Sequence, residues 1–77
     1  MPELRSFTVR EMRELRERGG DVRVNPNKAE ASEALVSYVM DLFPNVNWDQ
    51  FAYNKVSKFA MDMFAYSITP KEEELKN

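Results

Sequence analysis

The stretch NKAEASEALVSYVMDLFP, residues 27–44, decides the fold. Its apolar residues recur three and four positions apart, which places them on one broad helical face; they are Ala31, Ala34, Leu35, Tyr38, Val39, Leu42 and Phe43. Asn27 is a favourable N-cap, and Glu30 follows it at the spacing of a capping box. Pro44 cannot continue a helix. The sequence therefore predicts a helix over about 28–43.

The segment before this stretch predicts a first, highly charged helix. Thr8 and Glu11 have the spacing of a capping box, and Phe7 stands where it could pack on Met12 as a hydrophobic staple. The apolar positions form a narrow stripe at 9, 12 and 15, and the pair Gly19-Gly20 suits the left-handed residue that ends many helices. We expect a helix over about 8–18 that needs a partner surface, with Met12 and Leu15 docking it.

The segment after Pro44 predicts a third helix over about 48–68. Asn47 and Gln50 repeat the N-terminal capping signature, and Thr69-Pro70 ends the periodic pattern. We expect an all-α fold with three helices in a single domain over 1–70, and a short helical turn is compatible with the charged, flexible tail 71–77. Its predicted core is Leu35, Val39, Leu42, Phe51, Val56, Phe59, Ala60 and Met63.

Composition argues against catalysis. The 77 residues include no Cys and no His, which removes disulfides, Cys-based metal sites and the commonest general base. The carboxylates lie on amphipathic helix surfaces without a sign of convergence, and no EF-hand spacing occurs. We therefore expect no catalytic residues, no metal and no cofactor. Apolar runs are short and no signal peptide is visible, so we expect a cytoplasmic chain without a membrane partner.

The arginines are the main feature of the first third of the chain. All six occur within residues 1–23, but five acidic residues accompany them, and the net charge of the whole chain is −2. Arg10–Glu14, Arg13–Glu17 and Glu14–Arg18 have the spacing of surface ion pairs on a helix. The acidic balance argues against nucleic acid, although residues 28–68 could be scored as a helix-turn-helix motif. A more specific hypothesis is that Arg13 and Arg16 contact an anionic partner.

The aromatic and methionine content favours a protein partner. Three short helices enclose few large side chains, and five Phe, three Tyr, one Trp and five Met exceed that need. The surplus predicts an exposed apolar patch for protein binding or homo-oligomer formation. Our candidates for this patch lie off the main apolar stripe of the third helix: Tyr53, Met61, Phe64 and Tyr66.

Two segments resemble a known family. The opening FTVREMREL, residues 7–15, resembles the start of small tail assembly chaperones of long-tailed bacteriophages. The segment LVSYVMDLFPNVNWDQF, residues 35–51, is similar to that family's helix, Pro-x-Val type turn and capped next helix. The resemblance covers residues 7–66, while the linker 19–27 is shorter than is usual in the family.

The resemblance implies a non-enzymatic helper of tail assembly. Such chaperones coat the extended tape-measure protein, keep its long apolar helices soluble, and recruit tail-tube subunits in the host cytoplasm. Two other functions stay open. A small inhibitor or adaptor, such as an anti-defence or polymerase-binding protein, would dock one to one on a folded target through a few aromatic and Arg anchors. A DNA-binding protein would bind with steep salt dependence.

Overall fold

The computed structural model describes residues 1–69, which contain three α helices and no strand. They are α1 (Val9–Glu17), α2 (Lys28–Leu42) and α3 (Tyr53–Ile68), with a 3-10 turn at Trp48–Gln50 before α3. The predicted all-α, three-helix fold is confirmed. The expected helical turn after Thr69 and the charged tail 71–77 lie outside the described residues.

The first two helices begin and end where their caps predict. Thr8 and Glu11 form the complete capping box of α1, in which each side chain binds the other residue's backbone N–H. The side chain of Asn27 accepts a hydrogen bond from the Glu30 N–H at the start of α2. Local hydrogen bonding by these polar side chains thus fixes both helix starts.

The third helix begins later than predicted. A continuous helix from residue 48 is wrong, because the chain is extended at Phe51 and Ala52, between the 3-10 turn and α3. Asn47 makes no side-chain capping bond. Instead the Trp48 indole N–H donates to the Phe43 carbonyl at 3.1 Å, and the ring is buried. Packing of Trp48 onto the end of α2 therefore overrides the local capping signal.

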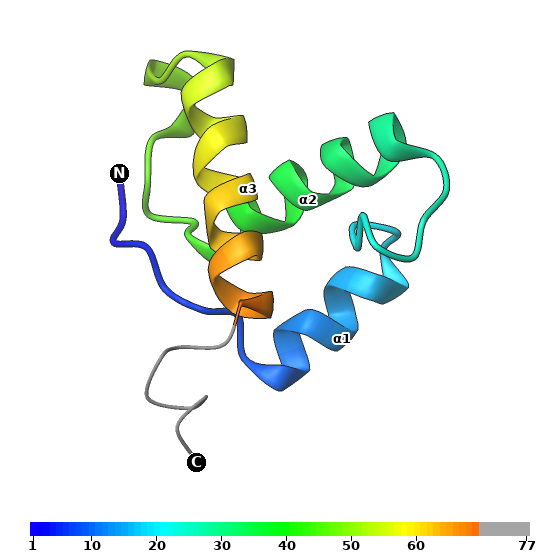
Figure 1. Ribbon diagram of the computed structural model, residues 1–77. Helices are drawn as coiled ribbons and strands as arrows, with labels where there is room; N and C mark the ends of the chain where they lie inside the picture. Colours follow the sequence, from blue (N-terminus) through cyan, green and yellow to red (C-terminus); the bar gives the residue numbers. More distant parts are fainter. Residues whose placement is uncertain (70–77) are drawn as a thin grey trace.

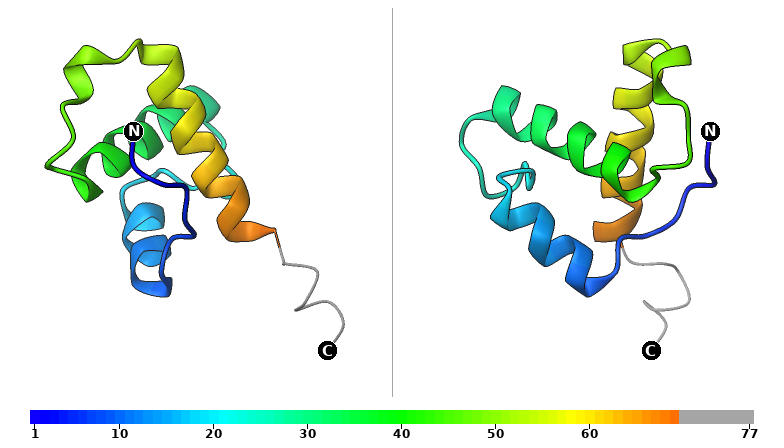
Figure 2. Two further views of the ribbon diagram at one scale, coloured as in Figure 1. Left: turned by 90° about the vertical axis from the view of Figure 1, so that its left-hand side faces the viewer. Right: turned by 180° about the vertical axis from the view of Figure 1, so that it is seen from behind.

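The helices are arranged with α1 and α2 on the same side of α3 (Figures 1 and 2). After α2 the connector runs along α3 to reach its start. The N-terminal segment lies against both helices, where Phe7 contacts Tyr38 of α2 and Ser67 of α3. Side chains of all three helices meet in one core. As predicted, it contains Leu15, Leu35, Val39, Val56, Ala60 and Met63.

Several core predictions were incomplete. Four predicted members lie only partly buried at the edge of the core: Met12, Leu42, Phe51 and Phe59. The core also contains residues that the prediction left out: Phe7, Val36, Tyr38, Trp48 and Phe64. Phe43 packs edge-on against Trp48 and Phe59, with centroid separations of 6.4 and 6.2 Å. The aromatic residues thus hold the connector against α3.

A close approach at the end of α1 fixes how it meets α2. Gly19 adopts a φ of +82°, and the N–H groups of Gly19 and Gly20 donate to the carbonyls of Arg16 and Leu15. These are the two bonds of a Schellman motif. A Cβ on Gly20 would lie 2.3 Å from Leu15 Cδ1 and 3.2 Å from the Leu35 nitrogen. The position has no room for a side chain.

We predict that Gly20→Ala lowers the free energy of unfolding by about 1–3 kcal/mol, because the added methyl overpacks a closed site. Chemical denaturation monitored by circular dichroism measures this change. Ser37→Ala, at an exposed position of α2, is the control and should change stability by less than about 0.5 kcal/mol. Equal stability of Gly20→Ala and the wild type would contradict the close approach.

Candidate functional site

One side of α1 combines apolar and cationic side chains at the surface. Val9, Met12, Arg13 and Arg16 lie three and four positions apart, and together they line a small depression of about 230 Å³. We call these four residues the α1 outer face. Val9 is 77% exposed, whereas Leu15 on the same helix is fully buried. The outer face contains two guanidinium groups and no carboxylate.

The opposite side of α1 is used for packing. Leu15 is buried in the core. Glu14 accepts a hydrogen bond of 2.8 Å from the Tyr38 hydroxyl, and burial, followed by this carboxylate, raises the pKa of Tyr38 well above its usual range. Arg18 lies over the Tyr38 ring and donates to Asp41 of α2 at 3.0 Å. These contacts hold α1 with its outer face away from α2.

The start of α1 is held by the N-terminal segment. The Phe7 N–H donates to the Ser67 hydroxyl at 2.7 Å, and the Phe7 ring packs 6.0 Å from that of Tyr38. Arg5 forms two hydrogen bonds with Glu11, at 2.8 and 3.1 Å, and lies over the Phe43 ring. Both ends of α1 are therefore fixed, although the helix itself buries only one side chain, Leu15.

Ion pairs occupy some arginines and leave others available. Arg5 and Arg18 are bound as described, and Arg23 binds Asp21. Arg10 and Arg13 form no ion pair with any residue of 1–69, where none of the three helix-surface pairs predicted from spacing occurs. Glu14, which belongs to two of these predicted pairs, binds the Tyr38 hydroxyl instead.

A buried carboxylate anchors the turn between α1 and α2. Asp21 is 1% exposed and accepts three hydrogen bonds of 3.0–3.1 Å from the backbone and guanidinium of Arg23. Arg16 reaches the same carboxylate at the longer distance of 3.5 Å and keeps a side chain that is 60% exposed. The bonds from Arg23 hold the pKa of Asp21 below its usual value. Arg16 thus shares Asp21 with Arg23, at the longer distance.

The apolar patch predicted on α3 does not form as one surface. Phe64 is only 4% exposed, because it packs in the core and the Arg23 guanidinium covers its ring at 5.4 Å. Its prediction as an exposed binding residue is wrong. Met61 is partly buried against the core, and Tyr53 and Tyr66 are exposed at 66% and 40%. Tyr53 and Tyr66 lie thirteen positions apart, on different sides of α3 at about 3.6 residues per turn.

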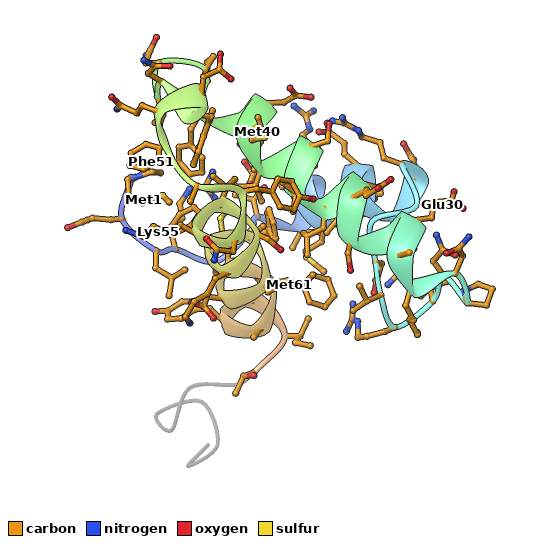
Figure 3. All side chains as sticks on the ribbon, turned by 90° about the horizontal axis from the view of Figure 1, so that it is seen from above. Met1, Glu30, Met40, Phe51, Lys55 and Met61 are labelled. Atoms are coloured by element: carbon orange, nitrogen blue, oxygen red, sulfur yellow. The ribbon has the colours of Figure 1, made fainter. Side chains whose placement is uncertain are left out.

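The structure brings Arg13 and Arg16 together with two residues that the sequence assigned differently. Met12 and Leu15 were expected to dock this helix. Leu15 is fully buried and Met12 is partly buried against the core, whereas Val9 is 77% exposed. Helical spacing alone does not separate Val9 from Leu15, because it places both on one stripe. Figure 3 shows Met1, Phe51 and Lys55 grouped at one side of the molecule, with Glu30 at the opposite side.

Neither a metal site nor a membrane-spanning helix is found in the described part of the chain. Residues 1–69 hold no group of three His, Cys, Asp or Glu side chains that could bind a metal ion. Among these residues, no helix has the length and apolar character needed to cross a membrane. Comparison of the chain with protein-family models, curated proteins and solved structures gives no match. The resemblance to tail assembly chaperones stays a prediction from the sequence.

We predict that stability falls at acid pH through Asp21 and, by the same logic, through Glu11, whose pKa Arg5 lowers. A lowered folded-state pKa stabilises the fold above the unfolded value of about 4 and loses this effect as the pH falls through the folded value. Asp21→Asn should lower the free energy of unfolding at pH 7 by about 1–3 kcal/mol. It should also flatten the decline below about pH 4.

Denaturation curves at pH 2–7 measure both effects. Asp41→Asn is the matched control, because the Asp41 side chain is 64% exposed and pairs with only one arginine, Arg18. The Asp41→Asn substitution should lower the free energy of unfolding by less than about 1 kcal/mol. If the free energy of unfolding of Asp21→Asn changed with pH in the same way as that of the wild type, Asp21 would not be a source of the acid sensitivity, which would contradict the prediction.

Proposed function

We propose that this chain is a non-enzymatic protein-binding module and that it acts as an assembly chaperone for helical segments of a larger structural protein. The observation that carries the proposal is the α1 outer face. Val9 is 77% exposed on a helix whose other side is packed, and Arg13 beside it has no ion pair within residues 1–69. An exposed apolar side chain beside available arginines is typical of a protein-binding surface.

The physical role is transient cover for an amphipathic helix. A helix that lies against the outer face would contact Val9 and Met12 with its apolar side and the arginines with its polar margin. The face is small, so a single copy would bind weakly, and stable cover would need many copies along an extended partner. This fits the tape-measure protein that the family resemblance implies, in the cytoplasm of an infected host.

A one-to-one inhibitor or adaptor is the alternative from the sequence. It needs a compact set of aromatic and Arg anchors on one surface. The aromatic candidates of α3 offer less support for this, since Phe64 is buried and Tyr53 and Tyr66 lie apart. DNA binding has less support still, because Arg5, Arg18 and Arg23 are engaged within the chain.

We predict that affinity capture from the native cells recovers a long, helix-rich protein in substoichiometric amount relative to the tagged chain. Val9→Ser combined with Arg13→Glu should remove this partner, because both changes lie on the α1 outer face and are exposed. Tyr53→Ser, at an equally exposed position on α3, is the matched control and should retain it. Mass spectrometry identifies the partner, and circular dichroism confirms that each variant is folded.

Three results would contradict the proposal. Recovery that is equal for the α1 double variant and the wild type would exclude the outer face. Recovery of one globular enzyme at a one-to-one ratio would favour the inhibitor. Recovery of many unrelated proteins that nuclease treatment abolishes would favour nucleic acid.

A further inference from the structure

The charges of the α1 outer face indicate which chemical groups its partner must carry. Arg13 has no acidic partner among residues 1–69. Arg16 pairs at 3.5 Å with the Asp21 oxygen that Arg23 binds at 3.0 Å, and its side chain is still 60% exposed. No acidic side chain lines the depression. Guanidinium groups bind carboxylates with two parallel hydrogen bonds, which fixes orientation as well as charge. The face therefore presents the guanidinium of Arg13, unpaired within residues 1–69, and the mostly exposed side chain of Arg16 to carboxylates, beside Val9 and Met12.

The spacing of the face specifies the shape of the occupant. From residue 9 to residue 16 the helix rises about 10 Å, which two turns of a second helix would match. Arg13 and Arg16 are three positions apart, so their side chains lie about one turn from each other. On a facing helix, acidic residues three or four positions apart have the same separation.

We propose that the α1 outer face binds a partner helix that carries two carboxylates one turn apart, with an apolar side chain between them. The proposal rests on the proposed function and names the chemistry of the segment that it covers. Arg13 and Arg16 select the carboxylates, and Val9 and Met12 contact the apolar side chain. Helices that are apolar but lack this acidic pair are bound weakly.

Other anionic partners fit this face less well. Nucleic acid and anionic membranes attract many cations at once, whereas this chain carries a net charge of −2 and the face offers two arginines. A second copy docked face to face would bring arginines against arginines, because a two-fold interface places the same patch on both sides. The sequence Glu72-Glu73-Glu74-Leu75 of the chain itself has suitable chemistry and must be distinguished by experiment.

The test uses the full-length chain and a synthetic helical peptide with Glu at two positions four apart around a central Leu. Isothermal titration calorimetry measures its affinity, with a second peptide in which both Glu are Gln. We expect the Gln peptide to bind at least about tenfold more weakly, a difference of about 1.4 kcal/mol. Arg13→Gln should lower the affinity for the Glu peptide by a similar factor. Lys55→Gln, which replaces an exposed cation on α3, should leave this affinity unchanged.

Four outcomes would overturn the proposal. Equal binding of the two peptides would show that the partner needs no carboxylates. An unchanged affinity of Arg13→Gln for the Glu peptide would show that the peptide does not bind at the α1 outer face. Stronger binding of anionic phospholipid vesicles or duplex DNA than of the Glu peptide, with the same loss in Arg13→Gln, would assign the face to those partners. Binding that appears only when Glu72, Glu73 and Glu74 are replaced by Lys would make the chain's own segment the occupant.

This failure is distinguishable from failure of the proposed function. If captured partners depend on the α1 outer face but the Glu and Gln peptides bind equally, the face binds protein and only the acidic chemistry is wrong. If capture does not depend on the face at all, the proposed function itself is wrong.

Discussion

The absence of a side chain at residue 20 lets the end of α1 pack closely against α2. A Cβ there would lie 2.3 Å from Leu15 Cδ1, so the turn closes only around glycine. The closure places Leu15 beside Leu35 and brings Asp21 into the interior. A helix of nine residues is too short to be stable alone, and this contact supplies the tertiary support that it needs.

Ion pairs add to the close contact at Gly20 in holding the helices together. Arg5, Arg18 and Arg23 each bind a carboxylate and also lie over an aromatic ring, so each links a charged surface group to the core. Exposed ion pairs contribute little, but the buried Asp21 carboxylate requires its partners. Arg5, Arg18 and Arg23 are thus engaged within the chain, whereas Arg13 on the α1 outer face has no ion pair within residues 1–69.

The sequence was a good guide wherever the decisive forces are local. Thr8, Asn27 and Gly19 fix helix ends through hydrogen bonds and backbone conformation within a few residues, and these ends were predicted correctly. The start of α3 was missed, because the Trp48 ring is buried against Phe59 of α3, and this packing outweighs the local capping signal. Contacts between residues distant in the chain are not encoded in helical periodicity.

The same difference between local and long-range contacts explains which parts of the candidate site could be predicted. Phe64 was assigned to the surface from its place on a helical wheel, but Arg23, from a turn forty residues earlier, covers its ring. Arg13 and Arg16, which were candidates from the sequence, lie with Val9 and Met12 around one depression, and the sequence did not predict this grouping. Val9 is 77% exposed, whereas Leu15, near the glycine end of the helix, is fully buried.

The most direct test of this account is the exposure of methyl groups to a soluble gadolinium chelate, measured as relaxation enhancement in NMR spectra of the full-length chain. The account predicts strong enhancement for the Val9 methyls and protection of the Leu15 methyls comparable to that of Leu35. Such a contrast within one short helix would show that α1 packs through its Leu15 side and presents its outer face. Equal protection of Val9 and Leu15 would mean that the outer face is covered and would contradict the account.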